Sequence, residues 1–325
     1  MRRSRVRTIL TALAVIAVFG FLAAYWLFYD NRLPTKGHFE LDSAALHREA
    51  ALLPGPKATS IEVEILSHRN VPKIALVAGS DWGALDTVRA SYRLMFPDRS
   101  IIVDTAYDAA GSHANHDDSY DAQSWQRLVA AMRTASAIVV THEHGDHIGG
   151  LLTSPDAPDL LTKAIVSQAQ FDHPDLTLPV RWPRGSREHF VPLRYIGLHA
   201  IAPGVVLVAA PGHTPGSQMI YVELANGRRY LFMGDVASAA DDVRLQRIRS
   251  RMVTDFMTRD DRTAVMLQTM ALHRLAAAEP KMTLVPGHDG PAIAALEGAH
   301  LLRRGFSLEA SNDRLPSTIA ADSNK

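Results

Sequence analysis

Residues 141–150, with the sequence THEHGDHIGG, place three histidines and one aspartate within six consecutive positions, directly after the apolar run AIVV. Such a run predicts a buried strand, and loops at strand ends are where side chains converge on an ion. His142 and His144 are two positions apart, so they face the same side of an extended segment, and a glycine lets the backbone turn before Asp146 and His147. Imidazole and carboxylate together bind zinc, manganese or iron, so this segment predicts part of a metal site.

The same local pattern recurs at three later points, each an apolar run followed by a tight turn that carries one possible metal ligand. VVLVAAPGHTPGS presents His213, RRYLFMGD presents Asp235, and KMTLVPGHDG presents His288. Strand ends that meet at one edge of a sheet bring such side chains together. The chain therefore offers seven candidate ligands, which are enough for two metal ions that share one carboxylate.

Composition narrows the types of ligand and partner. The chain of 325 residues contains no cysteine, so disulfides and thiolate ligands are excluded and any metal must be held by histidine and carboxylate. Lysine plus arginine and aspartate plus glutamate both number 34, so the formal charge is zero. Nucleic-acid-binding proteins usually carry a basic surface, and this balance gives no reason to expect nucleic acid as a partner.

The N-terminus differs in character from the rest of the chain. Residues 1–8 include four arginines, and the 21 residues from 9 to 29 carry no charge and end in YWLFY. Roughly 20 apolar residues span a bilayer as a helix, and aromatic side chains favour its interface. We expect a membrane anchor over 9–29 with the arginines in the cytoplasm and the domain outside, which in a bacterium means the periplasmic face of the inner membrane. A cleaved signal peptide and a buried core helix are the alternatives, although the bulky end lacks a small-residue cleavage site.

The remaining chain is expected to form a linker over 30–59, a folded domain over 60–308 and a flexible tail over 309–325. VRASYRLMF and IIVDT flank the turn PDRS and predict a hairpin. Other apolar or alternating runs predict strands at 60–66, 73–79, 137–140, 162–168, 204–210, 217–224, 228–234 and 281–285. Helices are expected at 39–53, 124–135, 241–257, 261–278 and 291–305, with a polar loop over 106–122. Strands in both halves with helices between them predict a layered α/β protein.

The metal motifs occur in a fixed order: HxHxDH, a single histidine in PGHTPGS, an aspartate in GD after a strand, and a late GHD. Together they resemble the metallo-β-lactamase superfamily over about residues 60–300. The resemblance implies a four-layer αβ/βα sandwich with the metals at one end of the two sheets. It assigns one ion to His142, His144 and His213, the other to Asp146, His147 and His288, and the bridge between them to Asp235. Asp104, in IIVDT, matches a family aspartate that supports the site without being a ligand; an ordinary turn residue is the alternative.

The resemblance further implies a hydrolase with two zinc ions, for which manganese or iron are alternatives. Two ions about 3.5–4 Å apart can bind a hydroxide between them, because metal binding lowers the pKa of water to about 7. Asp146 is the expected catalytic residue, which would orient the hydroxide and pass a proton to the leaving group. The expected substrate is a small molecule, and the oligomeric state is left open.

The carboxylate at Asp235 narrows the class of substrate. The true β-lactamases generally lack a bridging aspartate at this strand end, so the resemblance favours a lactone, ester or thioester, with β-lactamase and phosphodiesterase activity as alternatives. The best-known quorum-quenching lactonases carry a tyrosine three residues after this aspartate, where the present chain has Ser238. A non-catalytic metal-binding module is the alternative from another class, although it would not need seven ligands.

Three segments offer weak candidates for substrate contacts. The loop that contains His113 and His116 would cover the metals, and a solvated loop is the alternative. Arg244 shares a helical face with arginines three and seven positions later, which would meet an anionic substrate or lipid headgroups unless that face is simply solvated. One wall of an acyl-binding pocket is expected from four apolar residues, Met252, Phe256, Met257 and Met266. The alternative is that these residues pack in the core of a helical layer.

Overall fold

The computed structural model describes residues 2–307, so the predicted tail over 309–325 lies outside the described residues. Its first sheet has seven strands in the order β12-β1-β2-β3-β5-β6, with β4 paired to β1. Their bounds are β1 (Ser60–Pro72), β2 (Ala84–Met95), β3 (Ser100–Val103), β4 (Ser119–Tyr120), β5 (Ala137–Val139), β6 (Ala164–Ile165) and β12 (Arg303–Arg304). β2 and β3 pair antiparallel across the PDRS turn, which confirms the predicted hairpin.

The second sheet has five strands in the order β11-β10-β9-β8-β7. Their bounds are β7 (Leu198–Ala202), β8 (Val205–Ala209), β9 (Gln218–Glu223), β10 (Arg229–Phe232) and β11 (Met282–Val285). β9 and β10 form a hairpin around the NGRR turn, whereas β11 lies parallel to β10 after a long helical crossover. The hairpin at NGRR and the three strands agree with the sequence-based expectation, which did not include the parallel pairing of β11.

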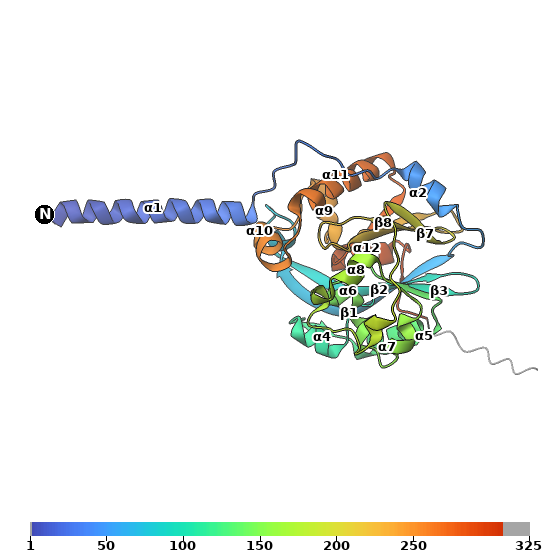
Figure 1. Cartoon of the computed structure of the whole chain (residues 1–325). Coiled ribbons are helices and arrows are strands. Elements are labelled where there is room, and N and C mark those ends of the chain that lie inside the picture. The colour runs from blue at the N-terminus through green and yellow to red at the C-terminus, as the bar shows by residue number, and fades with distance from the viewer. Residues whose placement is uncertain (1, 308–325) are drawn as a thin grey trace, which may run out of the picture.

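Helices cover the outer faces of both sheets, so the described chain has four layers (Figure 1). One outer layer contains α2 (Ser43–Ala50), α9 (Ala240–Leu245) and α11 (Arg262–Ala278). The other contains α4 (Ala109–Ala114), α5 (Ala122–Thr134), α6 (Gly145–Thr153) and α7 (Ala157–Leu161). The remaining helices and short turns are α1 (Arg2–Phe28), α3 (Lys73–Leu76), α8 (Gln168–Asp172), α10 (Arg251–Val253), α12 (Gly290–Gly298), the 3-10 turns η1 (Pro174–Thr177), η2 (Ser186–Glu188) and η3 (Gly234–Val236), and the π-helical turn η4 (Thr254–Thr258).

The side chains of the central strands point alternately to the two faces of each sheet, and both faces are buried. In β9, Ile220 and Val222 pack into the core between the sheets, while Met219 and Tyr221 pack on the opposite side beneath the outer helices. Successive strand residues point to opposite faces, so a strand buried on both sides must be apolar throughout. The predicted layering of strands and helices is confirmed.

Four segments differ from the sequence-based expectation. The helix expected over 291–305 ends at Gly298 as α12, because Arg303–Arg304 pair with β1 as the edge strand β12. Residues 73–79 do not form a strand, because β1 continues to Pro72 and the chain must then turn back at once to begin β2 opposite it. The predicted helix over 241–257 breaks at Gln246, whose φ is +52°, and resumes only as the short α10 and η4. The polar loop over 106–122 contains α4 and β4.

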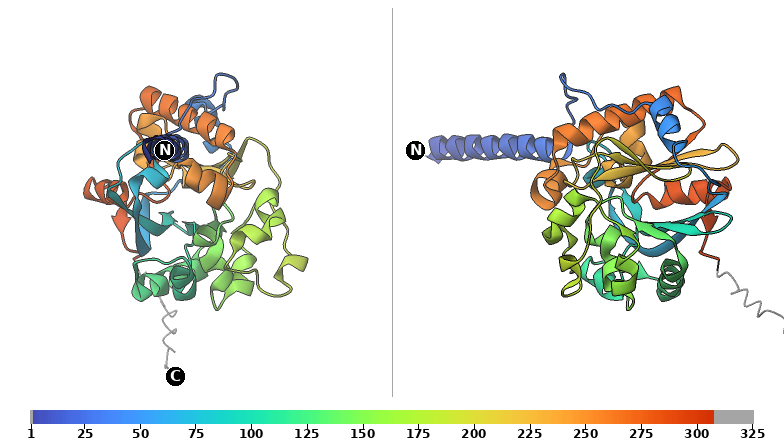
Figure 2. Two further views of the ribbon diagram at one scale, coloured as in Figure 1. Left: turned by 90° about the vertical axis from the view of Figure 1, so that its left-hand side faces the viewer. Right: turned by 45° about the vertical axis from the view of Figure 1, so that its right-hand side comes forward.

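The N-terminal helix α1 stands clear of the domain, and α10 lies beside its C-terminal end (Figures 1 and 2). Its part from Arg5 to Phe28 is long and apolar enough to cross a membrane, and it is not buried against the rest of the chain. The predicted linker over 30–59 includes α2, which begins at an Asp42 cap and buries Leu46 and Ala50 in the outer core of the second sheet. This part of the segment therefore packs on the domain.

Candidate metal centre

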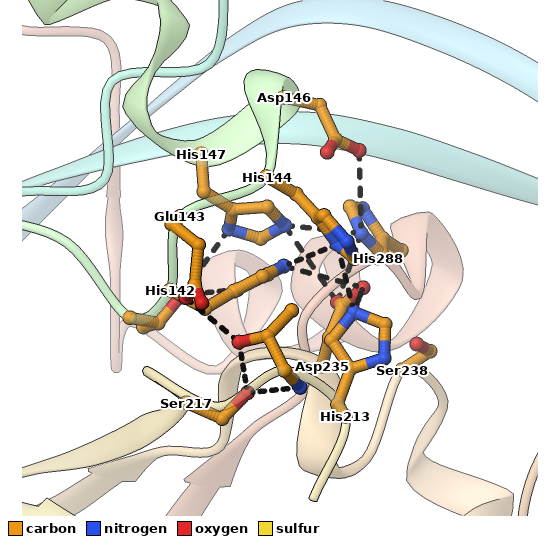
Figure 3. A network of polar contacts seen from close by, with 12 residues as sticks. His142, Glu143, His144, Asp146, His147, His213, Ser217, Asp235, Ser238 and His288 are labelled. Carbon is orange, nitrogen blue, oxygen red and sulfur yellow. Dashed lines mark hydrogen bonds and ion pairs between the residues drawn. The ribbon is translucent and has the colours of Figure 1, made fainter. Parts of the chain in front are cut away.

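All seven candidate ligands lie on segments that follow strands at one edge of the two sheets (Figure 3). Those of the HxHxDH motif follow β5 and enter the first turn of α6, whose N-cap is His144. His213 follows β8, Asp235 lies in η3 after β10, and His288 lies between β11 and α12. The strand ends thus bring together side chains as far apart in the sequence as His142 and His288.

Four of these residues form one possible metal-binding group, in which the donor atoms lie within 4.8 Å of one another: His142, His144, His213 and Asp235. Nδ1 of His144 lies 3.1 Å from Nε2 of His142 and 2.9 Å from Nε2 of His213. Nε2 of His213 lies 3.3 Å from Oδ2 of Asp235. The group contains three imidazoles and one carboxylate, which is a suitable set for a tetrahedral zinc ion.

The other three residues form a second group within the same distance limit: Asp146, His147 and His288. The Nε2 atoms of His147 and His288 are 3.3 Å apart. Oδ2 of Asp146 lies 3.7 Å from Nε2 of His288. Asp146 is partly accessible, so this group borders the solvent.

Asp235 presents one carboxylate oxygen to each group. Oδ2 faces His213 at 3.3 Å, and Oδ1 faces His288 at 2.9 Å. Oδ1 is buried but accepts no hydrogen bond of acceptable geometry within the described chain, although His288 is close. A buried oxygen without a hydrogen bond is costly, whereas a cation beside it would satisfy it. The residues present therefore fit two cations with Asp235 between them.

Asp104 lies directly behind the site, as the sequence suggested. Its Oδ2 lies 2.9 Å from Nδ1 of His147, and its Oδ1 accepts a hydrogen bond of 2.6 Å from the backbone N–H of Thr141. A carboxylate on the distal nitrogen of a histidine fixes the ring orientation and leaves the other nitrogen for a metal. Asp104 adopts φ +57°, a conformation that few non-glycine residues take, and these bonds hold it there.

Glu143, the residue between the first two histidines, is also buried. Its Oε2 accepts a hydrogen bond of 2.8 Å from the Thr214 hydroxyl, and its Oε1 accepts one of 3.1 Å from the backbone N–H of Gly216. This side chain therefore ties the HxHxDH loop to the loop that carries His213. No local pattern predicts this role, because the partner loop lies 71 positions away along the chain.

Two buried arginines contact the cluster and were not predicted as part of it. Nη2 of Arg249 lies 2.5 Å from Oδ2 of Asp235, and its Nη1 lies 3.5 Å from the buried carboxylate of Asp260. Nε of Arg89, on β2, lies 2.9 Å from Oδ2 of Asp146. Arg249 belongs to the segment expected to be one helix, and the break at Gln246 turns it inward.

Burial and neighbouring charges shift the pKa values of the ligands in different directions. Burial holds the pKa of the His142 imidazole well below its ordinary value and lowers that of His144 to about 3, so both rings are neutral and offer lone pairs. Burial also acts to lower the pKa of His147, but the carboxylates of Asp104 and Asp146 raise it to about 9. Burial disfavours ionised Asp235, yet the positive charge of Arg249 and the contacts of His288 and His213 together outweigh it and keep the pKa of Asp235 well below the usual range.

The weak candidates for substrate contacts lie outside this cluster. His113 and His116 are exposed on and just after α4, and Arg244 is exposed on α9, where its Nε donates to Asp241 at 2.8 Å. Of the expected acyl-binding wall, Met266 is buried in the core, while Phe256 and Met257 line a cleft of about 880 Å³ together with His144 and His213. The structure therefore brings only the η4 part of that wall to the metal centre.

Comparison with known proteins agrees with this geometry. The family model of the metallo-beta-lactamase superfamily matches residues 91–288, which include every candidate ligand. The chain belongs to the metallo-beta-lactamase superfamily. Curated relatives include proteins described as probable metallo-hydrolases of Mycobacterium tuberculosis and Mycobacterium bovis, each 35% identical over 112 residues. That match covers 30% of this chain and 36% of each relative, so it spans about a third of their length.

Solved structures of this superfamily share the fold. An N-acyl homoserine lactone hydrolase, with the product N-hexanoyl-L-homoserine bound at its catalytic metal centre, superposes with a TM-score of 0.54 at 16% identity, over 74% of this chain and 96% of the other. A probable metal-dependent hydrolase from Staphylococcus aureus gives a TM-score of 0.53 at 12% identity, over 72% and 91% of the two chains. At these identities the likeness establishes the metallo-beta-lactamase fold alone.

Proposed function

We propose that this protein is a dinuclear zinc hydrolase that cleaves a lactone, ester or thioester bond and is held at a membrane by α1. The observation that carries the proposal is the placement of Asp235, whose two oxygens face the two ligand groups at 3.3 Å and 2.9 Å. A carboxylate shared in this way suits a two-metal catalytic site, whereas a structural zinc site is usually closed by four ligands. His142, His144 and His213 would hold one ion, and Asp146, His147 and His288 the other.

The two ions, when bound, would supply a water activated for attack and stabilise the developing negative charge. The protein's own part is to fix their ligands and to handle one proton. Arg89 orients Asp146 by a contact of 2.9 Å, and Asp146 is the ligand with access to solvent. Asp146 would hold the proton taken from water and release it to the leaving oxygen or sulfur.

The cleft beside His144 and His213 supports an acyl substrate, because Phe256, Met257 and Leu176 line it. Lactone hydrolases are among the proteins that share the fold, so lactones are the first substrates to test. Ser238 stands where the best-known lactonases have tyrosine, and its hydroxyl is occupied by Arg249, so it is not free to take that tyrosine's place at a substrate. β-Lactams and phosphodiesters remain second candidates.

The test uses the full chain, purified in detergent and loaded with zinc, against short-chain acyl-lactones, aryl esters, thioesters, a β-lactam and a phosphodiester. We expect two zinc ions per chain and hydrolysis of one of the first three classes. Asp146→Ala should abolish turnover, and Asp118→Asn, which changes an exposed carboxylate, should not. Two bound ions without turnover of any substrate would favour a non-catalytic metal-binding module.

The proposed membrane anchor rests on the length, hydropathy and exposure of Arg5–Phe28. The expected position of the domain is outside the cytoplasm, because the arginines of the first eight residues favour the cytoplasmic side. Protease added to intact spheroplasts should digest the domain and leave α1 in the membrane. A domain protected from protease would contradict this orientation.

A further inference from the structure

The end of α1 is fastened to the domain rather than joined by a free tether. The backbone N–H of Gly79 donates to the carbonyl of Phe28 at 2.8 Å, and Oδ2 of the buried Asp30 accepts a hydrogen bond of 2.9 Å from Nε of Arg251. The guanidinium of Arg251 also lies 5.0 Å from the centre of the Trp26 ring. Because these contacts come from different elements, they fix the direction in which the domain faces relative to the helix axis.

Large apolar side chains are exposed on the face from which α1 emerges. Trp82 is 58% exposed and lies 4.9 Å from Phe28, ring centre to ring centre. Phe256 and Met257, in η4, are 63% and 67% exposed, and η4 follows α10 directly. α10 lies beside the end of α1 in Figure 1, and the left view of Figure 2 looks along α1 onto this side of the domain. We call Trp82, Met252, Phe256 and Met257 the apolar face.

The same face forms the mouth of the metal centre. Phe256 and Met257 line the 880 Å³ cleft, which is also lined by His144 and His213. The exposed Arg259 lines it as well, and Arg32 lines a second cleft with Tyr25 and Trp26 at the end of α1. Apolar side chains flanked by guanidinium groups suit the boundary between acyl chains and phosphate headgroups.

A helix that crosses the bilayer and ends at Phe28 would place this face at the bilayer surface. We infer that the apolar face docks onto the membrane, and that the cleft admits a long-chain acyl ester directly from the lipid phase. The inference rests on the hydrolase and anchor proposed above, and it names the class of substrate: a membrane-partitioned amphiphile. Water adds across the acyl carbon–oxygen bond, giving a fatty acid and an alcohol.

Docking can be measured with spin labels, independently of activity. Because the chain contains no cysteine, a single introduced cysteine carries the only label. A spin label on Met257→Cys is compared with one on Leu52→Cys, in the full chain reconstituted into phosphatidylcholine vesicles. Leu52 is 63% exposed and follows α2, at the end of the domain away from α10 (Figure 1). The label at 257 should collide more with oxygen, which concentrates in lipid, than with a water-soluble nickel chelate, and the label at 52 should show the reverse. Both labels in water would overturn the docking.

Substrate access is tested with two esters of the same alcohol, a soluble butyryl ester and a palmitoyl ester embedded in the vesicles. The double variant Trp82→Ser/Met252→Ser changes exposed residues of the apolar face that do not line the cleft. It should lower turnover of the palmitoyl ester by about tenfold and leave that of the butyryl ester unchanged. The matched control Leu52→Ser/Leu53→Ser should change neither rate. Equal loss on both esters would overturn entry from the lipid phase. Absence of turnover of both esters by the unmodified chain would overturn ester hydrolysis itself, while the labels would still decide the docking.

Discussion

Nη2 of Arg249 lies 2.5 Å from Oδ2 of Asp235, the oxygen that also faces His213. A buried guanidinium therefore neutralises the carboxylate on which both ligand groups converge. Its charge is also shared with the buried Asp260, 3.5 Å away. Arg249 thus stabilises the ligand framework before any cation binds.

Replacement of Arg249 should therefore matter most in the metal-free protein. Removing one partner of a buried ion pair typically costs about 3–5 kcal/mol, so Arg249→Met should lower the Tm of the chelator-treated chain by about 10 °C. The loss should be smaller with zinc, because the ions supply positive charge at Asp235. Thermal denaturation with and without chelator measures both values. Arg244→Met, at an exposed position, is the control, and an equal loss in both states would refute this role.

Arg89 should act through Asp146 rather than on the substrate. Its Nε lies 2.9 Å from Oδ2 of Asp146, and its side chain is buried. Outer contacts to metal ligands typically contribute about 10-fold to 100-fold, so Arg89→Met should lower kcat by that factor with KM unchanged, and Arg89→Lys should recover part of it. A rise in KM at constant kcat would instead assign Arg89 to substrate binding.

Asp104 should set the affinity of the second ligand group. Its Oδ2 lies 2.9 Å from Nδ1 of His147, and an amide in its place would hold the ring less firmly. Asp104→Asn should weaken zinc binding by about 10-fold to 100-fold, measured by competition with a chelating dye. Asp118→Asn is the matched control on the surface. Unchanged affinity in Asp104→Asn would leave this aspartate with a structural role only.

The stability of the domain should decline as pH rises, in part through Asp242. This carboxyl is buried in α9, its Oδ1 lacks a hydrogen bond, and burial raises its pKa to about 8 from an ordinary 3.8. Between pH 4 and pH 8 the folded state keeps the proton on Asp242, whereas the unfolded state releases it. The contribution of this proton to the free energy of unfolding is therefore complete below about pH 4, and it decreases as the pH rises to about 8. Asp242→Asn should therefore show a Tm advantage that grows by a few degrees between pH 5 and 8.

The neighbouring Asp241 provides a control of opposite sign. Hydrogen bonds from Arg244 and Lys73 lower its pKa, so its contribution is present above about pH 4 and is lost as the pH falls. Asp241→Asn should therefore have a lower Tm than the unmodified chain at pH 8, and it should show no Tm advantage that grows with pH. A flat Tm difference between Asp242→Asn and the unmodified chain from pH 5 to 8 would contradict a protonated Asp242.

The strand-end motifs explain why much of the site could be predicted from sequence. His213, Asp235 and His288 each follow an apolar run by a few residues, and strands of one sheet deliver their ends to a common edge. The distance between ligand and strand end is local, so it is visible in the sequence. Asp104 also follows a strand, β3, which is the parallel neighbour of β5, but only the family resemblance predicted its role.

The parts that could not be predicted depend on tertiary structure. Arg249 is one of several arginines in a segment predicted to be helical, and only the left-handed turn at Gln246 directs it to Asp235. Arg89 lies on β2, in a strand whose sequence carries three charged residues, and which of them faces Asp146 depends on the register with β1. The short helix α3 likewise follows from where β1 and β2 pair, which local propensity does not encode.

The central claim is that two cations share Asp235, and crystallography at the zinc absorption edge tests it most directly. Crystals of the zinc-loaded chain should give two anomalous peaks about 3.5–4 Å apart, with the Asp235 carboxylate between them. One peak should be surrounded by His142, His144 and His213, and the other by Asp146, His147 and His288. A single peak, with Asp235 still paired to Arg249 and bound to no more than one ion, would contradict the dinuclear centre.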